Sequence, residues 1–123
     1  MKPCVFTGSA VAIVTPFCGE SVDLEAFDRL IERQIQGGTD AIVVCGTTGE
    51  AATLSYDERM ALIERCVRTV DRRVPVIAGS GTNSTASSIA LSKAAQSAGV
   101  DALLTVTPYY NKASQSGLVQ HFS

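Results

Sequence analysis

Four short apolar runs recur along the chain, and longer segments with helical spacing separate them. Each run is apolar at consecutive positions and rich in β-branched and aliphatic residues, which is typical of parallel strands buried on both faces. Equivalent positions in successive runs are 29, 35 and 27 residues apart, the length of one strand–helix unit. The pattern therefore predicts parallel strands in sequential order, joined by right-handed crossovers. The predicted strands cover residues 10–14, 41–45, 74–78 and 102–106.

The first two intervening segments carry helix end signals. In the first, Asp23 can cap the amino end, and Gly37-Gly38 ends the helix. In the second, Ser55 and Glu58 have the spacing of a capping box. The apolar stripes comprise Leu24, Phe27, Leu30, Ile31 and Ile35 in the first helix, and Met60, Ile63, Val67 and Val70 in the second.

A third helix is predicted to open near residues 83–85 and to stop at Gly99, and a fourth begins at Ser114. Alternating strands and helices define an α/β fold with two familiar closures: an open doubly wound sheet, or a (β/α)8 barrel of about 250 residues. The sequence ends inside the fourth helix without a Gly or Pro stop signal. We therefore predict that residues 1–123 are one partial domain, the N-terminal half of a barrel. The third apolar stripe comprises Ile89, Leu91, Ala94, Ala95 and Ala98.

Composition narrows the function classes. The 123 residues are 46% hydrophobic and 18% charged, which excludes a disordered chain and a disulfide mini-protein. A net charge of −2 leaves no basic stripe for a phosphate backbone, so nucleic acid is not an expected partner. No apolar run is long enough to span a bilayer, and the first eight residues do not resemble a secretory signal. We expect a soluble cytoplasmic protein that does not bind a membrane.

The cysteines and the single histidine do not form a metal-binding pattern. Cys4, Cys18, Cys45 and Cys66 are 14, 27 and 21 residues apart, and His121 is far from all of them in the sequence. We interpret the four cysteines as reduced thiols in packing roles. The sequence therefore predicts neither a metal site nor a cofactor.

The loop after the second strand carries the first candidate chemistry. Gly46-Thr47-Thr48-Gly49 can turn two successive N–H groups inward beside two hydroxyls, which suits a small carboxylate. The loop has no lysine, which disfavours nucleotide phosphate. An ordinary turn with threonine side-chain bonding explains the motif equally well. For Glu50, we favour a structural role, accepting backbone N–H bonds within the loop, over acid–base catalysis.

Tyr109 and Tyr110 follow the fourth strand in a loop expected to be extended. Adjacent side chains of an extended segment point in opposite directions, so one tyrosine should face the site and the other a neighbouring surface. A tyrosine hydroxyl near a threonine hydroxyl can pass protons in acid–base work on a carbonyl adduct. Two half-buried aromatics at a subunit interface remain an equal alternative.

These motifs look like those of a known family and occur in the same order along the sequence. Through them the whole chain resembles the dihydrodipicolinate synthase family, one of the class I aldolase-like lyases. The paired threonines and the Tyr-Tyr-Asn loop are more similar to this family than to the related N-acetylneuraminate lyases. The motifs that carry the resemblance lie at residues 6–9, 12–17, 46–50, 75–79 and 106–111.

The resemblance implies a (β/α)8 enzyme, a homotetramer of tight dimers, that condenses pyruvate with aspartate semialdehyde through a lysine Schiff base in lysine biosynthesis. It further implies that Thr47 is the relay hydroxyl and that Thr48 helps to hold the pyruvate carboxylate. Tyr110 would be the relay tyrosine lent to the neighbouring subunit, with Tyr109 at the dimer interface. The family's Schiff-base lysine and its second catalytic tyrosine lie on later strands, which this sequence does not reach.

Lysines within the sequence are not expected to replace the Schiff-base lysine. An imine-forming amine needs partial desolvation at a strand end to lower its pKa. Lys2, Lys93 and Lys112 are instead interpreted as solvated cations. Two other functions stay open: a non-catalytic half-barrel that pairs with another half, and another pyruvate-dependent aldolase of the same family.

Regulation is the last expectation from the resemblance. In feedback-inhibited members, free lysine binds at the dimer interface through an asparagine and a tyrosine, matched here by Asn83 and Tyr109. The family's glutamate is replaced by Ser87 and its histidines by Tyr56 and Arg59. We therefore expect little sensitivity to lysine, unless another carboxylate such as that of Glu58 takes the glutamate's place.

Overall fold

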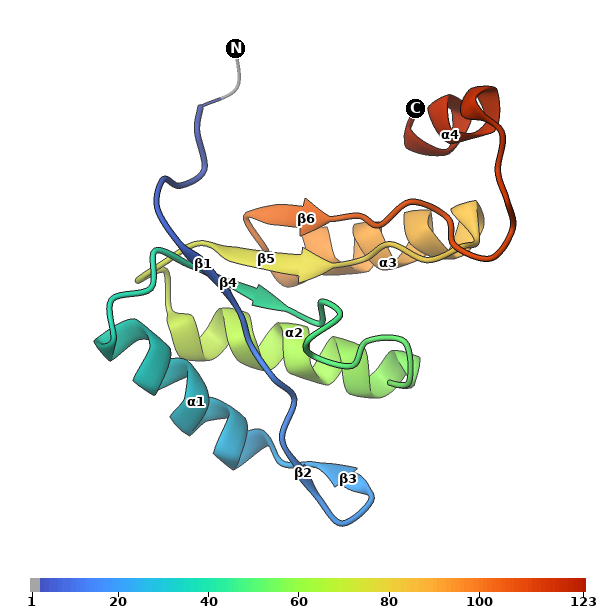
Figure 1. Ribbon diagram of the computed structural model, residues 1–123. Coiled ribbons are helices and arrows are strands. Elements are labelled where there is room, and N and C mark those ends of the chain that lie inside the picture. Colours follow the sequence, from blue (N-terminus) through green and yellow to red (C-terminus); the bar gives the residue numbers. More distant parts are fainter. Residues whose placement is uncertain (1–2) are drawn as a thin grey trace.

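The computed structural model describes residues 3–123 as a four-stranded parallel sheet flanked by helices (Figure 1). The strand order is β1-β4-β5-β6, so each strand pairs with the next one of the predicted series. This order confirms the sequential arrangement and is not that of a doubly wound sheet. The strands are β1 (Ala10–Ala12), β4 (Ala41–Val44), β5 (Val76–Gly79) and β6 (Ala102–Leu104).

The four predicted helices are present, and each has the side-chain cap that the sequence favours. Helix α1 (Leu24–Gln36) starts at Asp23, whose carboxylate accepts from the Ala26 N–H at 2.8 Å. Helix α2 (Tyr56–Val70) starts with the predicted capping box, because the Ser55 hydroxyl and the Glu58 carboxylate each accept from the other's backbone N–H. Helices α3 (Thr85–Ala98) and α4 (Gln115–Phe122) start at serine caps, Ser84 and Ser114.

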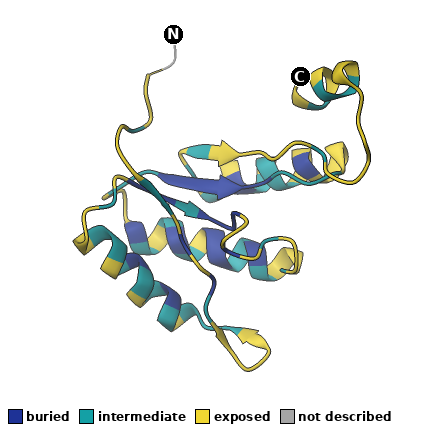
Figure 2. Ribbon diagram, viewed as in Figure 1, coloured by how far each residue is buried: buried dark blue, intermediate teal, exposed yellow. Residues whose placement is uncertain are grey.

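One face of the sheet and helices α1 to α3 form the hydrophobic core (Figure 2). Register places Ile42, Val44, Val76 and Ala78 on that face, and all four are buried. The opposite face is less covered: Ala12 is exposed, and Leu104 is 51% exposed. The prediction that both faces of every strand are buried is therefore confirmed for β5 and wrong for the edge strands β1 and β6 in this chain.

Three further features differ from the sequence-based predictions. A two-stranded antiparallel hairpin, β2 (Phe17–Cys18) and β3 (Ser21–Val22), was not predicted. Ile89 is 50% exposed, whereas Ser88 on α3 is buried, so the third apolar stripe is only partly correct. Cys45 and Cys66 are buried as expected, but Cys4 and Cys18 are exposed and do not pack in the core.

Helix α4 lies apart from the core and has no buried residue (Figure 1). It contacts the start of α3 through His121, whose Nδ1 lies 2.7 Å from the Thr85 hydroxyl. The described part of the chain contains no helix that is both long and apolar enough to cross a membrane. Within residues 3–123, no cluster of His, Cys, Asp or Glu is arranged to hold a metal ion.

Candidate active site

The loop that follows β4 is a tight turn flanked by two residues in the left-handed region. Cys45 and Glu50 have φ values of 55° and 59°, which non-glycine residues adopt at a cost of about 1–3 kcal/mol when the surroundings enforce it. The Gly46 carbonyl accepts from the Gly49 N–H at 3.1 Å, and the Thr47 carbonyl accepts from the Glu50 N–H at 3.0 Å. The backbone around the two threonines is thus held in one conformation.

A threonine from the neighbouring strand region fixes the end of this loop. The Thr15 hydroxyl is buried and donates to the Gly49 carbonyl at 2.7 Å. A Cβ on Gly49 would lie 3.2 Å from the Ile13 carbonyl oxygen, so the segment after β1 also limits the space at this position. The sequence predicted no individual role for Thr15, although it follows a strand and lies in the motif at residues 12–17.

Glycine on β5 lets the two strand ends approach each other. A Cβ on Gly79 would lie 2.0 Å from the Cys45 carbonyl oxygen, and one on Gly81 would lie 2.4 Å from the Val106 nitrogen. Both distances are far below van der Waals contact, so neither position tolerates a side chain without backbone movement. These glycines bring the loops after β4, β5 and β6 together at the carboxyl edge of the sheet.

The two threonines present unengaged donors at this edge. Thr47 and Thr48 are exposed, and neither their hydroxyls nor their amide N–H groups bond to another group within residues 3–123. Successive free N–H groups in a turn form a concavity that favours an anion. The observed loop therefore offers the donors that the sequence predicted for a small carboxylate.

A cavity of about 350 Å³ opens beside Thr47 at the carboxyl ends of β4, β5 and β6. Tyr109 and Arg59 line it together with Thr47, whereas Tyr110 does not. Parallel α/β folds place their functional groups at this edge of the sheet. The cavity therefore lies where a barrel enzyme of this topology carries its active site.

The tyrosine pair is split by exposure as expected, although the reason differs. Tyr109 is 50% exposed and lines the cavity, while Tyr110 is 94% exposed. Tyr110 has a φ of 69°, so the loop is not extended there, and that premise of the prediction is wrong. In this chain the Tyr110 side chain is exposed to solvent.

Arg59 is the functional candidate whose environment the sequence did not indicate. It was expected only as a replacement for a family histidine, but it is 7% exposed and braces the loop by donating from Nη2 to the Ala51 carbonyl at 2.6 Å. Its positive charge lies near Cys45, whose pKa burial raises to about 12 while Arg59 acts in the opposite direction. Burial likewise raises the pKa of Cys66 to about 12, so neither core thiol is a nucleophile at neutral pH.

Two acidic side chains near the site and Asn83 have identifiable surroundings, of which that of Glu50 differs from the prediction and that of Glu58 confirms it. The Glu50 carboxylate accepts no bond from the described residues; instead the Glu50 carbonyl accepts from Thr53, through its N–H at 3.0 Å and its hydroxyl at 3.1 Å. Glu58 is engaged in the predicted capping box, and it does not line the cavity beside Thr47. Asn83 and Asn111 pair with each other, with the Asn111 Nδ2 donating to the Asn83 carbonyl at 2.7 Å.

None of the described lysines belongs to the site. Lys93 is exposed on α3, and Lys112 is exposed in the loop before α4. Lys2 lies outside the described residues. These positions agree with the interpretation of Lys93 and Lys112 as solvated cations.

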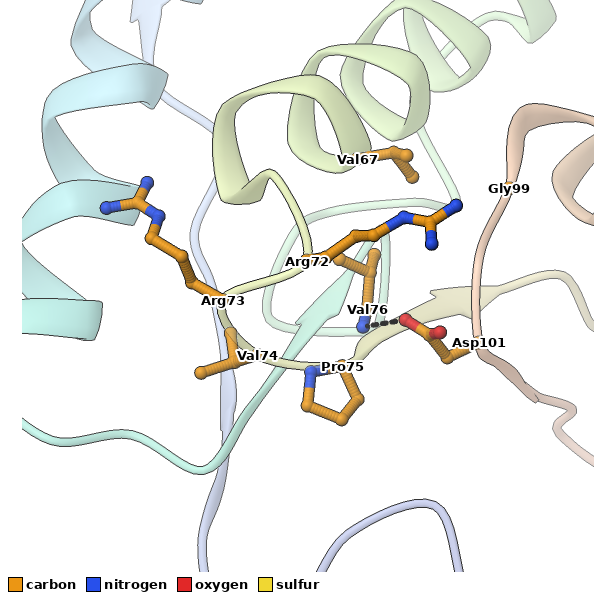
Figure 3. Close-up of a pocket in the computed structure, with 8 residues that line it drawn as sticks. All are labelled: Val67, Arg72, Arg73, Val74, Pro75, Val76, Gly99 and Asp101. Carbon is orange, nitrogen blue, oxygen red and sulfur yellow. Dashed lines mark hydrogen bonds between the residues drawn. The ribbon is translucent and has the colours of Figure 1, made fainter.

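A second hollow, of about 450 Å³, lies at the opposite edge of the sheet (Figure 3). There the Asp101 carboxylate accepts from the Val76 N–H at 2.8 Å and so fixes the start of β5. Figure 3 shows the Arg73 side chain extending away from Asp101, and its guanidinium pairs with Glu32. This hollow lies at the amino ends of the strands. In barrel folds, residues at that end contribute to stability, and the catalytic residues lie at the opposite end.

Comparison with known proteins decides the family. Residues 5–123 match the model of the dihydrodipicolinate synthetase family. The chain belongs to this family. Four parallel strands with alternating helices, matched to barrel structures of the family over about 40% of their length, agree with the predicted N-terminal half of a (β/α)8 barrel.

Individual family members are similar over nearly the whole chain. A 4-hydroxy-tetrahydrodipicolinate synthase of Geobacter metallireducens is 57% identical over 119 residues, which are 97% of this chain and 41% of that protein. The crystal structure of dihydrodipicolinate synthase from Thermotoga maritima covers 97% of this chain and 40% of its own, with 47% identity and a TM-score of 0.94. The chloride-inhibited enzyme of Acinetobacter baumannii, complexed with pyruvate, has 49% identity and a TM-score of 0.94 over 97% of this chain and 41% of its own.

Proposed function

We propose that this chain is the N-terminal part of a 4-hydroxy-tetrahydrodipicolinate synthase, an aldolase-type lyase that condenses pyruvate with aspartate semialdehyde through a Schiff base. The single observation that carries the proposal is the loop after β4, with two unengaged amide N–H groups and two exposed threonine hydroxyls. Family relatives of that name, and a related structure that contains pyruvate, support the substrate class. The complete enzyme is a cytoplasmic homotetramer, and the product enters lysine biosynthesis.

In this proposal the loop binds pyruvate and orients it. The carboxylate accepts from the N–H groups of Thr47 and Thr48 and from the Thr48 hydroxyl, and charge-assisted bonds of this kind are worth about 1.5–3 kcal/mol each. The pyruvate carbonyl then faces the open side of the half-barrel, where the family's Schiff-base lysine would be supplied by later strands. Binding and orientation are therefore functions of the described residues, and imine formation is not.

Thr47 moves a proton in the proposed mechanism. Its hydroxyl lines the cavity and has no partner within residues 3–123, so it is free to exchange a proton with a phenol placed beside it. Tyr110 is displayed outward and is absent from this chain's own cavity lining, which favours its donation to the site of a neighbouring subunit. The cavity of one subunit would then be completed by the tyrosine of another.

Trapping with borohydride tests the lyase assignment. After incubation with pyruvate and borohydride, intact mass spectrometry should show one pyruvyl adduct on the full-length protein and none on the 123-residue chain. Peptide mapping should place the adduct beyond Ser123. An adduct on Lys93 or Lys112 would contradict the proposal that the described residues bind pyruvate but do not form the imine. The absence of any adduct on the full-length protein would contradict the proposed function.

Two substitutions test the relay roles in the full-length enzyme. Thr47→Val keeps the approximate shape and removes the hydroxyl, and Tyr110→Phe removes only the phenolic oxygen. Each should lower kcat by about two orders of magnitude, as is usual for a general acid–base group. If both variants retain rates within about threefold of the parent, the loop has only a structural role.

Weak sensitivity to lysine is proposed for a second cavity, of about 290 Å³, between the starts of α2 and α3. Tyr56, Arg59 and Ser87 line this cavity, and none of them supplies a negative charge to a free ammonium group. Glu58, the alternative acceptor, is held in the capping box of α2. Titration of lysine in a steady-state assay should give no half-inhibition in the submillimolar range.

An assembly role remains the second candidate because the edge strand β6, the segment that follows it and α4 expose apolar residues. Leu103, Leu104, Val106, Val119 and Phe122 are each at least 41% exposed. A non-catalytic half-barrel would cover this surface by pairing with another half. Another pyruvate-dependent aldolase of the family would share the site described above and differ in its aldehyde.

A further inference from the structure

One of the two free donors in the loop after β4 is oriented by a bond on the other side of its peptide group. In a trans peptide the carbonyl and the N–H point in opposite directions, so a bond that fixes one also fixes the other. The Thr47 carbonyl shares a peptide with the Thr48 N–H, and it accepts from the Glu50 N–H at 3.0 Å. The bond from Glu50 therefore directs the Thr48 N–H away from the turn.

The hydroxyl of Thr15 begins this series of bonds. It donates to the Gly49 carbonyl at 2.7 Å, and that carbonyl shares its peptide with the Glu50 N–H. The segment after β1 is thereby joined to the Thr48 N–H through two successive peptide groups. An amide whose carbonyl accepts a hydrogen bond becomes a stronger donor, so the bonds of such a series polarise one another.

Burial makes the Thr15 hydroxyl hard to replace. Thr15 is 7% exposed and Gly49 is buried, and no other described group donates to the Gly49 carbonyl. Removing one partner of a buried bond leaves the other unsatisfied. The next residue, Glu50, has a φ of 59°, which a non-glycine residue keeps only where its surroundings enforce it. Without the hydroxyl, the peptide of Gly49 and Glu50 is therefore free to rotate.

We propose that Thr15 is a positioning residue for the carboxylate site, because it sets the orientation and the donor strength of the Thr48 N–H. The proposal rests on the proposed function, in which that N–H binds the pyruvate carboxylate. Thr15 does not line the cavity beside Thr47, so it acts through the loop and not by touching the substrate. The Thr47 N–H is independent of Thr15, because the carbonyl of its peptide, that of Gly46, accepts from the Gly49 N–H.

Two variants of the full-length enzyme test this role by kinetics. Thr15→Val removes the hydroxyl, keeps the shape and weakens one bond to a charged group, so kcat/KM for pyruvate should fall about tenfold. The value of kcat/KM for the aldehyde should stay within about twofold of the parent, because this N–H does not hold the aldehyde in the proposed function. Thr15→Ser keeps a hydroxyl and should restore kcat/KM for pyruvate to within about threefold of the parent.

Thr53→Val is the matched control within the same loop. The Thr53 hydroxyl donates to the Glu50 carbonyl at 3.1 Å, but that carbonyl also accepts from the Thr53 N–H at 3.0 Å. The same substitution therefore removes a threonine hydroxyl without freeing a carbonyl, and it should leave kcat/KM for pyruvate unchanged. Urea unfolding of each variant identifies a loss of folded enzyme, which lowers kcat/KM for both substrates equally.

Amide exchange tests the series of bonds without reference to any reaction. Deuterium uptake by the peptide of residues 46–51 should be faster in Thr15→Val than in the parent, because the Glu50 N–H loses its fixed orientation. Uptake in Thr15→Ser should match the parent.

Three kinetic results would overturn the proposal: kcat/KM of Thr15→Val for pyruvate within about threefold of the parent, an equal loss for both substrates, or no rescue by Thr15→Ser. Parent-like exchange in Thr15→Val, with normal borohydride trapping of pyruvate by the parent, would contradict this inference alone. If the parent forms no pyruvyl adduct while Thr15→Val still speeds exchange in the loop, the proposed function is wrong and the link from Thr15 to the Thr48 N–H stands.

Discussion

The centre of the sheet and its carboxy-terminal flank have similar sequences and very different environments. Ile42 and Val44 on β4 are at most 1% exposed, whereas Leu103 and Leu104 on β6 are 41% and 51% exposed (Figure 2). Both segments are short runs of aliphatic residues in parallel register with a neighbour. The difference lies in what packs on them: helix α2 contacts β4, whereas β6 is an edge strand and its Leu104 lies on the opposite, less covered face of the sheet. An apolar run therefore indicates that a segment is to be buried, and the described residues bury β4 but leave β6 partly exposed.

The largest expected contrast is between two leucines. Leu62→Ala on α2 removes a side chain that is fully buried in the core and should lower the free energy of unfolding by about 2–5 kcal/mol. Leu104→Ala on β6 should change it by about 0.5 kcal/mol or less in the 123-residue chain, because the side chain is half exposed. Urea unfolding of the 123-residue variants measures both values.

The same pair sharpens the comparison when it is measured in the full-length protein. If later strands cover β6, Leu104→Ala becomes a core truncation there and should cost about 2 kcal/mol or more. Leu62→Ala should cost the same in both contexts, since its neighbours are already present. Equal costs of Leu104→Ala in the two contexts would show that β6 stays uncovered.

Two serine caps give a smaller contrast with matched geometry. Ser55 caps α2 and Ser114 caps α4, and each hydroxyl accepts from the N–H three residues later at 3.2 Å. Ser55→Ala should destabilise the 123-residue chain by about 1 kcal/mol, because α2 belongs to the core. Ser114→Ala should leave global unfolding unchanged and speed amide exchange only in α4, which has no buried residue. Faster exchange across β4 and β5 in Ser114→Ala would contradict this independence.

Local signals explain why much of the fold could be predicted. Asp23, Ser55 and Gly99 act within one helical turn of their own positions, so sequence alone locates the ends that they make. The hairpin at residues 17–22 was missed because two-residue strands carry almost no periodicity. In the same way, nothing local distinguishes Cys45 in the core from Cys18 on the surface.

The residues of the candidate site likewise differ in whether a local sequence signal reveals them. Thr47 and Thr48 were identifiable because the turn chemistry of Gly46-Thr47-Thr48-Gly49 is contained in four residues. The burial of Arg59 depends on the packing of α2 against the loop at residues 46–53 and against α3, which no spacing rule describes. Thr15 is a similar case, since its bond to Gly49 spans 34 residues.

The smallest expected effect concerns an ion pair that joins the two best-packed helices. Asp28 on α1 accepts from the Arg65 Nε at 2.9 Å and from the Thr69 hydroxyl at 2.6 Å, both on α2. Hydrogen bonding from Arg65 is the main cause that holds the pKa of Asp28 below its ordinary value. Both side chains are 29% exposed, so the pair should contribute no more than about 1 kcal/mol.

The sign of the pH dependence follows from the direction of that pKa shift. A carboxylate whose pKa is lower in the folded state than in the unfolded state stabilises the fold above its unfolded pKa, near 3.8, and this stabilisation is lost as the pH falls through the lower folded value. Asp28→Asn should therefore be less stable than the parent at pH 7, and the difference should shrink as the pH falls below about 4. Urea unfolding at a series of pH values measures this difference.

Glu64→Gln is the control, because Glu64 is an exposed residue on α2 without an ion pair among the described residues. Its difference from the parent should not shrink in this way. A constant difference between Asp28→Asn and the parent from pH 7 to pH 3 would mean that Asp28 acts through packing and its bond from Thr69 rather than through its charge.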